Sequence, residues 1–358
     1  MSQFNFQVEP FEYQSQLDGK WQSEINRNTH DYNRWLQRAL NQVLGLRLVE
    51  DGIIGTQTRS AIRSFQQRAG LLADGIAGAR TEAALIAAGA PKPGSVIQVP
   101  TIPTASSMPT LLKRESSPPT STLYVEIDLR ITDSFGKRVA PMTGIFIPAH
   151  FSPQASVDLI LYLHGFKTRP PDLTIDGYWN RQQSAHWPLR EGVNDSQRNV
   201  ILVAPTLGPR SQTGRLTQAG GLDAYLDQVL SALTAYGPYR TKPRVANIIL
   251  ACHSGGGYPM RRLATGNDRY ATLIRECWGF DCTYNTGDDT LWAQWARSHP
   301  QSQLYIYYRA NTRTEPLSLS LKRKNVPNVF VKASSANGHN LVPIAHWRER
   351  IQSAPFLP

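Results

Sequence analysis

The sequence has little of what builds small secreted or metal-stabilised proteins. Only three of its 358 residues are cysteines, whereas a disulfide scaffold needs dense, paired cysteines. No histidine cluster at metal-ligand spacing accompanies them, so they form no zinc signature. The three are Cys252, Cys277 and Cys282. A buried apolar core must therefore stabilise the fold, and a hydrophobic fraction of 41% is enough to build one.

Long apolar runs and a secretory leader are also missing. A membrane-spanning helix needs roughly 18–20 consecutive apolar residues, and the longest runs here, such as residues 159–163, have the length of a buried strand. The first residues have neither a basic region nor an apolar stretch, so we expect no signal peptide. We interpret residues 1–29, which show no periodicity, as a flexible leader.

Acidic residues are the minority charge. The chain has 38 Lys and Arg against 27 Asp and Glu, which gives a net charge of +11. Such a balance favours anionic partners. The basic residues are spread along the chain, and no basic run alternates with aromatic residues. A nucleic-acid binder is therefore the least favoured class.

Proline, serine and threonine dominate one segment, residues 89–121. A segment of this composition is extended and packs poorly. We therefore expect a linker there, between a small module at residues 30–88 and a large one at residues 122–358. At roughly 100–200 residues per domain, two domains suit the length of the chain.

The small module contains an internal repeat. Residues 51–58 read Asp-Gly-Ile-Ile-Gly-Thr-Gln-Thr, and residues 74–81 read Asp-Gly-Ile-Ala-Gly-Ala-Arg-Thr. In each copy glycines permit a tight turn, and the following residues open a helix. Residues 35–44 and 61–65 each place apolar side chains on one helical face. The pattern predicts three short helices joined by two similar turns.

These motifs, with Ser64-Phe65-Gln66-Gln67 after the first turn, resemble the peptidoglycan-binding domain of the three-helix type. The resemblance implies binding to peptidoglycan or another anionic envelope polymer of a bacterium. The Asp-Gly-Ile-x-Gly turns themselves are expected to fix the fold rather than to contact glycan, so the contact residues stay unassigned.

The large module alternates continuous apolar runs with amphipathic stretches. Residues 124–131 alternate and predict a half-buried strand. Continuous runs are typical of parallel strands that are buried on both faces, and residues 222–233 predict an amphipathic helix between two of them. The runs are residues 159–163, 200–203, 248–251, 304–308 and 329–331. This alternation predicts an α/β fold with a mostly parallel sheet.

The sharpest chemical signal is Ser254, which follows the apolar run 248–251. A strand that runs into a serine flanked by small residues is the setting of a nucleophile elbow. Cys252 and Gly256 stand two positions either side, so the pattern is C-x-S-x-G instead of G-x-S-x-G. A phosphate-binding loop would need G-x-G-x-x-G or G-K-[ST], and the segment has neither.

A second apolar run ends in His164-Gly165-Phe166. By position we assign the backbone N–H groups of Phe166 and Gly255 as oxyanion donors, because a helix N-terminus and a neighbouring turn can stabilise developing negative charge. The side chains of His164 and His253 are expected to be structural.

A general base should follow the last strand. His339 lies on a glycine-containing loop after residues 329–331 and is the predicted base, with His346 as the alternative. Asp281, at the end of residues 276–280, is the predicted orienting acid. Its rivals are Asp288, Asp289 and Glu315.

The order Ser254, Asp281, His339 resembles that of the α/β-hydrolase superfamily. The resemblance implies an esterase or lipase that forms an acyl-enzyme and needs neither metal nor organic cofactor, in an arrangement similar to phage-type lysis esterases. The substrate would be an ester, lipid esters included. An amidase or peptidase acting on wall peptides, and a non-catalytic wall-binding or delivered cargo protein, are the alternatives. The protein would be made in the cytoplasm and act at the envelope or outside, after lysis or specialised export.

Overall fold

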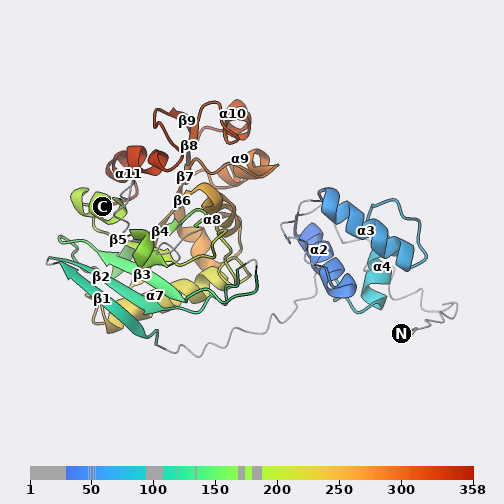
Figure 1. Cartoon of the computed structure of the whole chain (residues 1–358), viewed down its shortest axis with the longest axis horizontal. Helices are drawn as coiled ribbons and strands as arrows, with labels where there is room; N and C mark the ends of the chain where they lie inside the picture. The colour runs from blue at the N-terminus through green and yellow to red at the C-terminus, as the bar shows by residue number, and fades with distance from the viewer. Residues whose placement is uncertain are drawn as a thin grey trace. The chain divides into compact units, whose positions relative to one another are not determined.

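The computed structural model describes residues 30–46, 48, 50, 52, 54–93, 108–117, 119–133, 135–167, 174–179 and 188–358. The predicted leader, residues 1–29, lies outside them. The chain divides into two compact units, Met1–Val99 and Pro100–Pro358, and each is described by itself (Figure 1). Within the described residues, no helix has the length and apolar character needed to cross a membrane.

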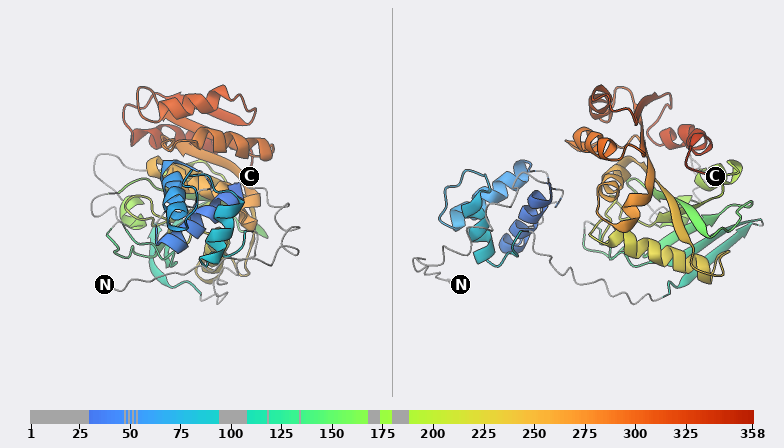
Figure 2. Two further views of the ribbon diagram at one scale, coloured as in Figure 1. Left: turned by 90° about the vertical axis from the view of Figure 1, so that its right-hand side faces the viewer. Right: turned by 180° about the vertical axis from the view of Figure 1, so that it is seen from behind.

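The first unit is a helical bundle, as its periodicity predicts. It contains α2 (His30–Leu44), α3 (Thr56–Arg68) and α4 (Ala79–Ala87), which pack around one apolar core (Figure 2). Leu36 and Leu40 of α2, Ile62 of α3 and Leu85 of α4 are almost fully buried in that core. The core residues recur every three or four positions, which places them on one face of each helix.

The first repeat turn is held by a buried glutamine from α2. The Gln37 side chain, 1% exposed, accepts a hydrogen bond from the Gly52 N–H over 2.7 Å and donates to the Thr58 hydroxyl over 3.4 Å. Gly52 has a φ of 76°, in the region that glycine tolerates best.

The second turn has the same hydrogen-bond arrangement, with a glutamine from the next helix. Gln66 of α3, 2% exposed, accepts from the Gly75 N–H over 2.9 Å and donates to the Thr81 hydroxyl over 3.2 Å. Gly75 has a φ of 78°. The repeated Gly and Thr positions therefore have a structural role, which agrees with the expectation that the turns fix the fold.

The second unit is built on one mixed sheet (Figure 1). Its strands are β1 (Leu111–Ser117), β2 (Thr120–Glu126), β3 (Met142–Ile147), β4 (Ser156–Leu163), β5 (Val200–Pro205), β6 (Arg244–His253), β7 (Ile274–Phe280), β8 (Gln303–Arg309) and β9 (Val329–Ser334). Within the described residues the strand order is β1-β2-β3-β5-β4-β6-β7-β8-β9. The strands from β5 to β9 in this order are parallel, and β1, β2 and β3 pair antiparallel.

Helices cover both faces of the sheet. They are α5 (Ile175–Trp179), α6 (Leu189–Asp195), α7 (Gly221–Ala235), α8 (Gly257–Ala264), α9 (Asp288–Ser298), α10 (Glu315–Arg323) and α11 (Leu341–Ser353), with the 3-10 turns η1 (Ser254–Gly256) and η2 (Arg269–Leu273). Leu159 and Leu161 of β4 join a core with α7 to α10, whereas Ile160 and Tyr162 join a core with α5, α6 and α11. Successive side chains thus point into opposite cores, which explains why the parallel strands read as continuous apolar runs. The predicted α/β class, with a small all-α unit before it, is confirmed.

Two sequence expectations differ from the structure. Residues 111–117 and 120–121 lie in β1 and β2, although their composition placed them in the linker. β1 is an edge strand with mostly exposed side chains, so polar residues fit it as well as they fit a linker. The predicted strand 124–131 ends at Glu126, and Arg130 has a φ of 51°, which extended strands do not adopt.

Candidate active site

Three parallel strands end next to the predicted catalytic residues, at one edge of the sheet. Ser254 follows β6, Asp281 follows β7, and His339 lies in the loop between β9 and α11. The strands β6, β7, β8 and β9 are neighbours and parallel. Their carboxyl ends therefore meet at the edge where open α/β sheets place their sites.

The backbone at Ser254 makes a sharp turn between strand and helix. β6 ends at His253, η1 follows, and α8 begins at Gly257. Ser254 has a φ of 53°, a conformation that non-glycine residues adopt rarely and at an energetic cost. Its side chain remains half-buried. This is the strand–turn–helix geometry of a nucleophile elbow.

Close packing explains which positions of the elbow must be small. A Cβ added to Gly256 would lie 2.2 Å from the Leu163 carbonyl oxygen, and one added to Gly257 would lie 2.4 Å from that of Cys282. Cys252, by contrast, is fully buried, and its side chain lies beside Gly256. The structure thus accommodates the departure from G-x-S-x-G at its first position.

Asp281 and His339 are joined by a hydrogen bond. His339 Nδ1 lies 2.7 Å from Asp281 Oδ2, and Asp281 also accepts hydrogen bonds from the Thr314 hydroxyl and from the Arg309 N–H. Burial alone would raise the pKa of Asp281, but these three hydrogen bonds outweigh it and lower the pKa below its usual value. The carboxylate is therefore ionised at neutral pH and holds the imidazole by Nδ1. This leaves Nε2 of His339 available to another group.

The rival acids have other partners. Asp288 forms a buried ion pair with Arg261 over 2.8 Å. Asp289 pairs with Lys324 over 3.3 Å, and Glu315 caps a backbone N–H four residues earlier in the chain over 2.7 Å. Of the four candidates, Asp281 is the one bonded to His339.

The alternative base, His346, lies on α11 and faces a different neighbourhood. Its Nε2 is 2.8 Å from the Ser334 hydroxyl, and its ring stacks on Tyr307 with centroids 4.1 Å apart. The geometry therefore favours His339 over His346 as the partner of Asp281.

The turn after β4 packs directly against the elbow. A Cβ on Gly165 would lie 2.7 Å from Ser254 Cβ, and one on Gly255 would lie 2.5 Å from the Phe166 ring. Glycine at position 165 lets this turn approach the elbow closely, and glycine at position 255 leaves room for the Phe166 ring. The structure thus places Phe166 and Gly255, the predicted oxyanion donors, beside one another next to Ser254.

The histidine before this turn has a structural position. His164 is fully buried, its Nδ1 lies 2.8 Å from the Gly165 carbonyl oxygen, and its Nε2 accepts a hydrogen bond from the Leu207 N–H over 2.8 Å. Burial and the nearby charge of Lys167 hold the pKa of His164 well below its usual value. Its ring is therefore neutral and fixes the loop.

Sequence reasoning missed two residues of the site. The Thr314 hydroxyl supports Asp281. The Tyr284 ring lies edge-on to His339 with centroids 6.4 Å apart. Burial raises the pKa of Tyr284 to about 12, so its hydroxyl stays protonated. Both residues come from loops without a motif, and no sequence signal pointed to them.

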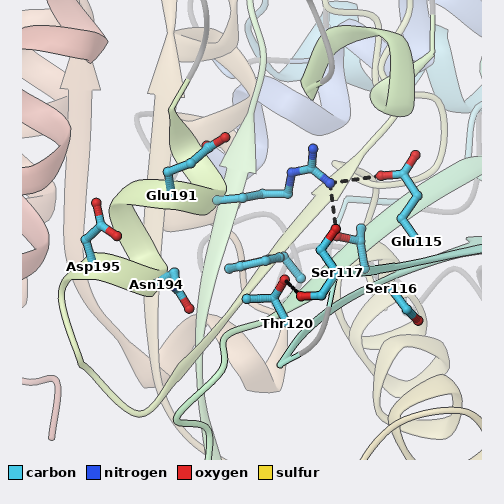
Figure 3. A pocket seen from close by; sticks show the side chains of 10 residues that line it. Glu115, Ser116, Ser117, Thr120, Glu191, Asn194 and Asp195 are labelled. Carbon is cyan, nitrogen blue, oxygen red and sulfur yellow. Dashed lines mark hydrogen bonds and ion pairs between the residues drawn. The ribbon is translucent and has the colours of Figure 1, made fainter.

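A cavity of about 500 Å³ lies elsewhere, between β1, β2 and α6 (Figure 3). The strand pairing puts it near the amino ends of the parallel strands, the edge opposite Ser254. Glu115 and Arg190 form an ion pair of 3.0 Å in its wall. Burial would raise the pKa of Glu115, but Lys113, Arg190 and Tyr124 lower it to about 2. The cavity is thus separate from the candidate site.

Comparison with known proteins supports the resemblance predicted for the first unit. Residues 29–85 match the family model described as a putative peptidoglycan binding domain. This N-terminal unit is similar to peptidoglycan-binding domains. A search of curated proteins found no match to the chain.

Solved structures similar to this chain include a hydrolase and an esterase. An S-formylglutathione hydrolase from Agrobacterium tumefaciens is 8% identical, with a TM-score of 0.42 over 68% of this chain and 96% of its own. Ferric enterobactin esterase from Salmonella typhimurium is 9% identical, with a TM-score of 0.43 over 67% of this chain and 59% of its own. The assignment of the fold rests on the strand order and the elbow, not on these distant likenesses.

Proposed function

We propose that the protein is a serine hydrolase that cleaves carboxylic esters through an acyl-enzyme. Ser254 is the nucleophile, His339 the general base and Asp281 the orienting acid. The observation that supports this assignment most directly is the 2.7 Å hydrogen bond between His339 and a buried Asp281, beside a serine held at a φ of 53°.

The reaction begins when His339 Nε2 takes the proton of the Ser254 hydroxyl as Oγ attacks the ester carbonyl carbon. The carbonyl oxygen becomes an oxyanion, which the backbone N–H groups of Phe166 and Gly255 stabilise. The C–O bond to the alcohol then breaks, and the alcohol leaves with the proton held by His339. The product of this first half is Ser254 esterified by the acyl group.

Water completes the cycle. His339 takes a proton from a water molecule, whose oxygen attacks the acyl carbon of the esterified serine. The second tetrahedral intermediate collapses to the free acid, and Ser254 Oγ recovers its proton from His339. Asp281 stabilises the imidazolium that forms in each half and keeps Nδ1 protonated, so that Nε2 always faces the reacting groups.

The N-terminal module, residues 30–88, would bring this chemistry to a bacterial envelope. The support is the match of residues 29–85 to a peptidoglycan-binding family and the net charge of +11, which favours an anionic surface. We propose that the protein acts at the envelope or outside the cell, with the second unit, from β1 onwards, as the catalytic domain.

Sedimentation with purified sacculi tests the envelope assignment. The intact Ser254→Ala protein should pellet with sacculi, because this variant keeps the N-terminal module. A fragment of residues 1–93, which contains the whole apolar core of that unit, should compete for the same sites. A fragment that stays in the supernatant would refute this assignment and leave the esterase proposal intact.

Substrate comparison tests the esterase assignment. The intact protein should hydrolyse short p-nitrophenyl esters faster than it releases peptides from muropeptides. Muropeptide cleavage without ester hydrolysis would indicate an amidase or peptidase with the same triad. No turnover of either substrate by folded protein would indicate a non-catalytic binding or cargo protein.

A further inference from the structure

The side chain of His253 is not used in the mechanism above, yet it lies between the elements that carry it. His253 is the last residue of β6 and directly precedes Ser254. Its side chain is buried, with 3% exposure. Being next to Ser254 in the sequence does not explain why a second imidazole is buried here. The explanation must come from the contacts of its ring.

Two contacts join His253 to His339. His253 Nε2 lies 3.1 Å from the His339 backbone carbonyl oxygen, and the two rings lie with centroids 4.4 Å apart and planes inclined by 38°. A carbonyl oxygen only accepts hydrogen bonds, so Nε2 of His253 must carry the proton. The contact thus fixes the tautomer of His253 and the path of the His339 backbone at once.

The other ring nitrogen of His253 faces the oxyanion turn. A Cβ added to Gly165 would lie 3.2 Å from His253 Nδ1 and 2.7 Å from Ser254 Cβ. The ring of His253 is therefore enclosed by the base loop on one side and by the turn before Phe166 on the other. One side chain contacts both groups that have to be aligned on the nucleophile.

The ring of His253 is also uncharged. Burial is the main reason, and the neighbouring His339 acts in the same direction; together they lower the pKa of His253 to about 3. A neutral neighbour matters because His339 gains a positive charge in each half-reaction, and a second cation 4.4 Å away would oppose it.

Taken with the proposed function, on which this inference rests, the geometry points to a positioning role. We propose that His253 holds the loop of His339 through its Nε2–H and its ring, so that Nδ1 of His339 stays on Asp281 while Nε2 faces Ser254. Two strand ends then fix the base: Asp281 after β7 holds its side chain, and His253 at the end of β6 holds its backbone.

Two substitutions of His253 distinguish the effect of its Nε2–H hydrogen bond from the effect of its ring packing. His253→Phe keeps an aromatic ring but cannot donate, whereas His253→Gln places an amide donor near the position of Nε2 without a ring. We expect H253F to lower kcat for a p-nitrophenyl ester by about 10- to 100-fold, because a displaced base costs this much, with KM changed less than about twofold. H253Q should recover at least part of the loss. H253M is the apolar replacement if H253F does not fold.

A matched control is His346→Phe. His346 also stacks on an aromatic ring and accepts or donates one hydrogen bond through Nε2, but it has no contact of this kind with His339. This variant should keep kcat within about twofold of the wild type. A similar loss in H346F and H253F would assign the effect to general destabilisation and overturn the positioning role.

A spectroscopic measurement makes the test independent of turnover. In the proton NMR spectrum, the Nδ1 proton that His339 shares with Asp281 should give a downfield signal that disappears in Asp281→Asn. In H253F this signal should broaden or vanish, and in H253Q it should return. An unchanged signal and an unchanged kcat in H253F would overturn the role of His253. Wild-type protein that shows the signal but never cleaves an ester would instead refute the proposed function.

Discussion

Both units of the protein fix a turn or a loop with a buried polar side chain, but the two arrangements end differently. In the first unit, Gln37 and Gln66 each hold a glycine N–H and a threonine hydroxyl. In the second, Asp281 and His253 hold the side chain and the backbone of His339. These amides hold groups of the two repeat turns, whereas the second network ends at an imidazole whose side chain is 33% exposed.

This difference separates a structural network from a reactive one. A buried side-chain amide does not titrate near neutral pH, so its hydrogen bonds contribute only to the stability of the fold. A buried carboxylate and a neutral imidazole around a half-exposed base set the charge, tautomer and direction of that base. The comparison predicts that substitutions in the first unit change folding, and those around His339 change the reaction.

The largest expected effect is on catalysis by Asp281→Asn. The amide would donate to His339 Nδ1 and favour the wrong tautomer, so kcat for a p-nitrophenyl ester should fall by about 10³- to 10⁴-fold. Steady-state kinetics and thermal unfolding should be measured together. If Asp281→Asn kept most of the wild-type kcat, the assignment of the acid would be wrong.

Asp288→Asn is the matched control, because Asp288 is equally buried but pairs with Arg261 instead of a histidine. Removing one partner of a buried ion pair costs about 3–5 kcal/mol of folding stability. This variant should unfold at a clearly lower temperature, while its folded fraction keeps a kcat close to that of the wild type.

The next effect concerns the stability of the first unit. Gln66→Leu removes the partner of the Gly75 N–H and the Thr81 hydroxyl, and leaving such buried groups unpaired costs about 1–3 kcal/mol each. Denaturant unfolding followed by circular dichroism should show the helical unit destabilised, and binding to sacculi should weaken. A fall in kcat on a soluble ester would contradict the purely structural role of Gln66.

A smaller effect concerns pH. Because the pKa of His253 is lowered from 6.5 to about 3 in the folded protein, the unfolded chain binds a proton there that the folded chain does not. The free energy of unfolding should therefore fall as the pH drops from about 6.5 towards 3. Above pH 6.5 His253 is neutral in both states, and none of this stability is lost. Thermal unfolding of His253→Phe should depend less steeply on pH between 6 and 4 than that of the wild type. Parallel curves would mean that His253 is not held neutral.

The smallest effect is expected at the first small position of the elbow. Cys252→Gly restores the usual glycine and leaves a small void, which costs about 1–2 kcal/mol, with kcat within about threefold of the wild type. Gly256→Ala is the contrasting change, since its Cβ would lie 2.2 Å from the Leu163 carbonyl oxygen. Equal melting temperatures for the two variants would show that the packing argument for the elbow is wrong.

The sequence predicted the parts of the site that depend on strands. Continuous apolar runs marked the parallel strands, and residues at their carboxyl ends necessarily share an edge. The placing of Ser254, Asp281 and His339 at one edge of the sheet could be predicted in this way. Thr314, Tyr284 and the contacts of His253 could not, because they depend on how loops fold back across that edge. β1 was missed because an exposed edge strand can have the composition of a linker.

The central claim is that Ser254 is a nucleophile activated by His339 and Asp281. Its most direct test is intact-protein and peptide mass spectrometry after treatment with a fluorophosphonate probe. We expect one adduct on the peptide that contains Ser254 in the wild type, none in Ser254→Ala, and strongly slowed labelling in Asp281→Asn. Folded wild-type protein that forms no adduct, or forms one on another residue, would contradict it.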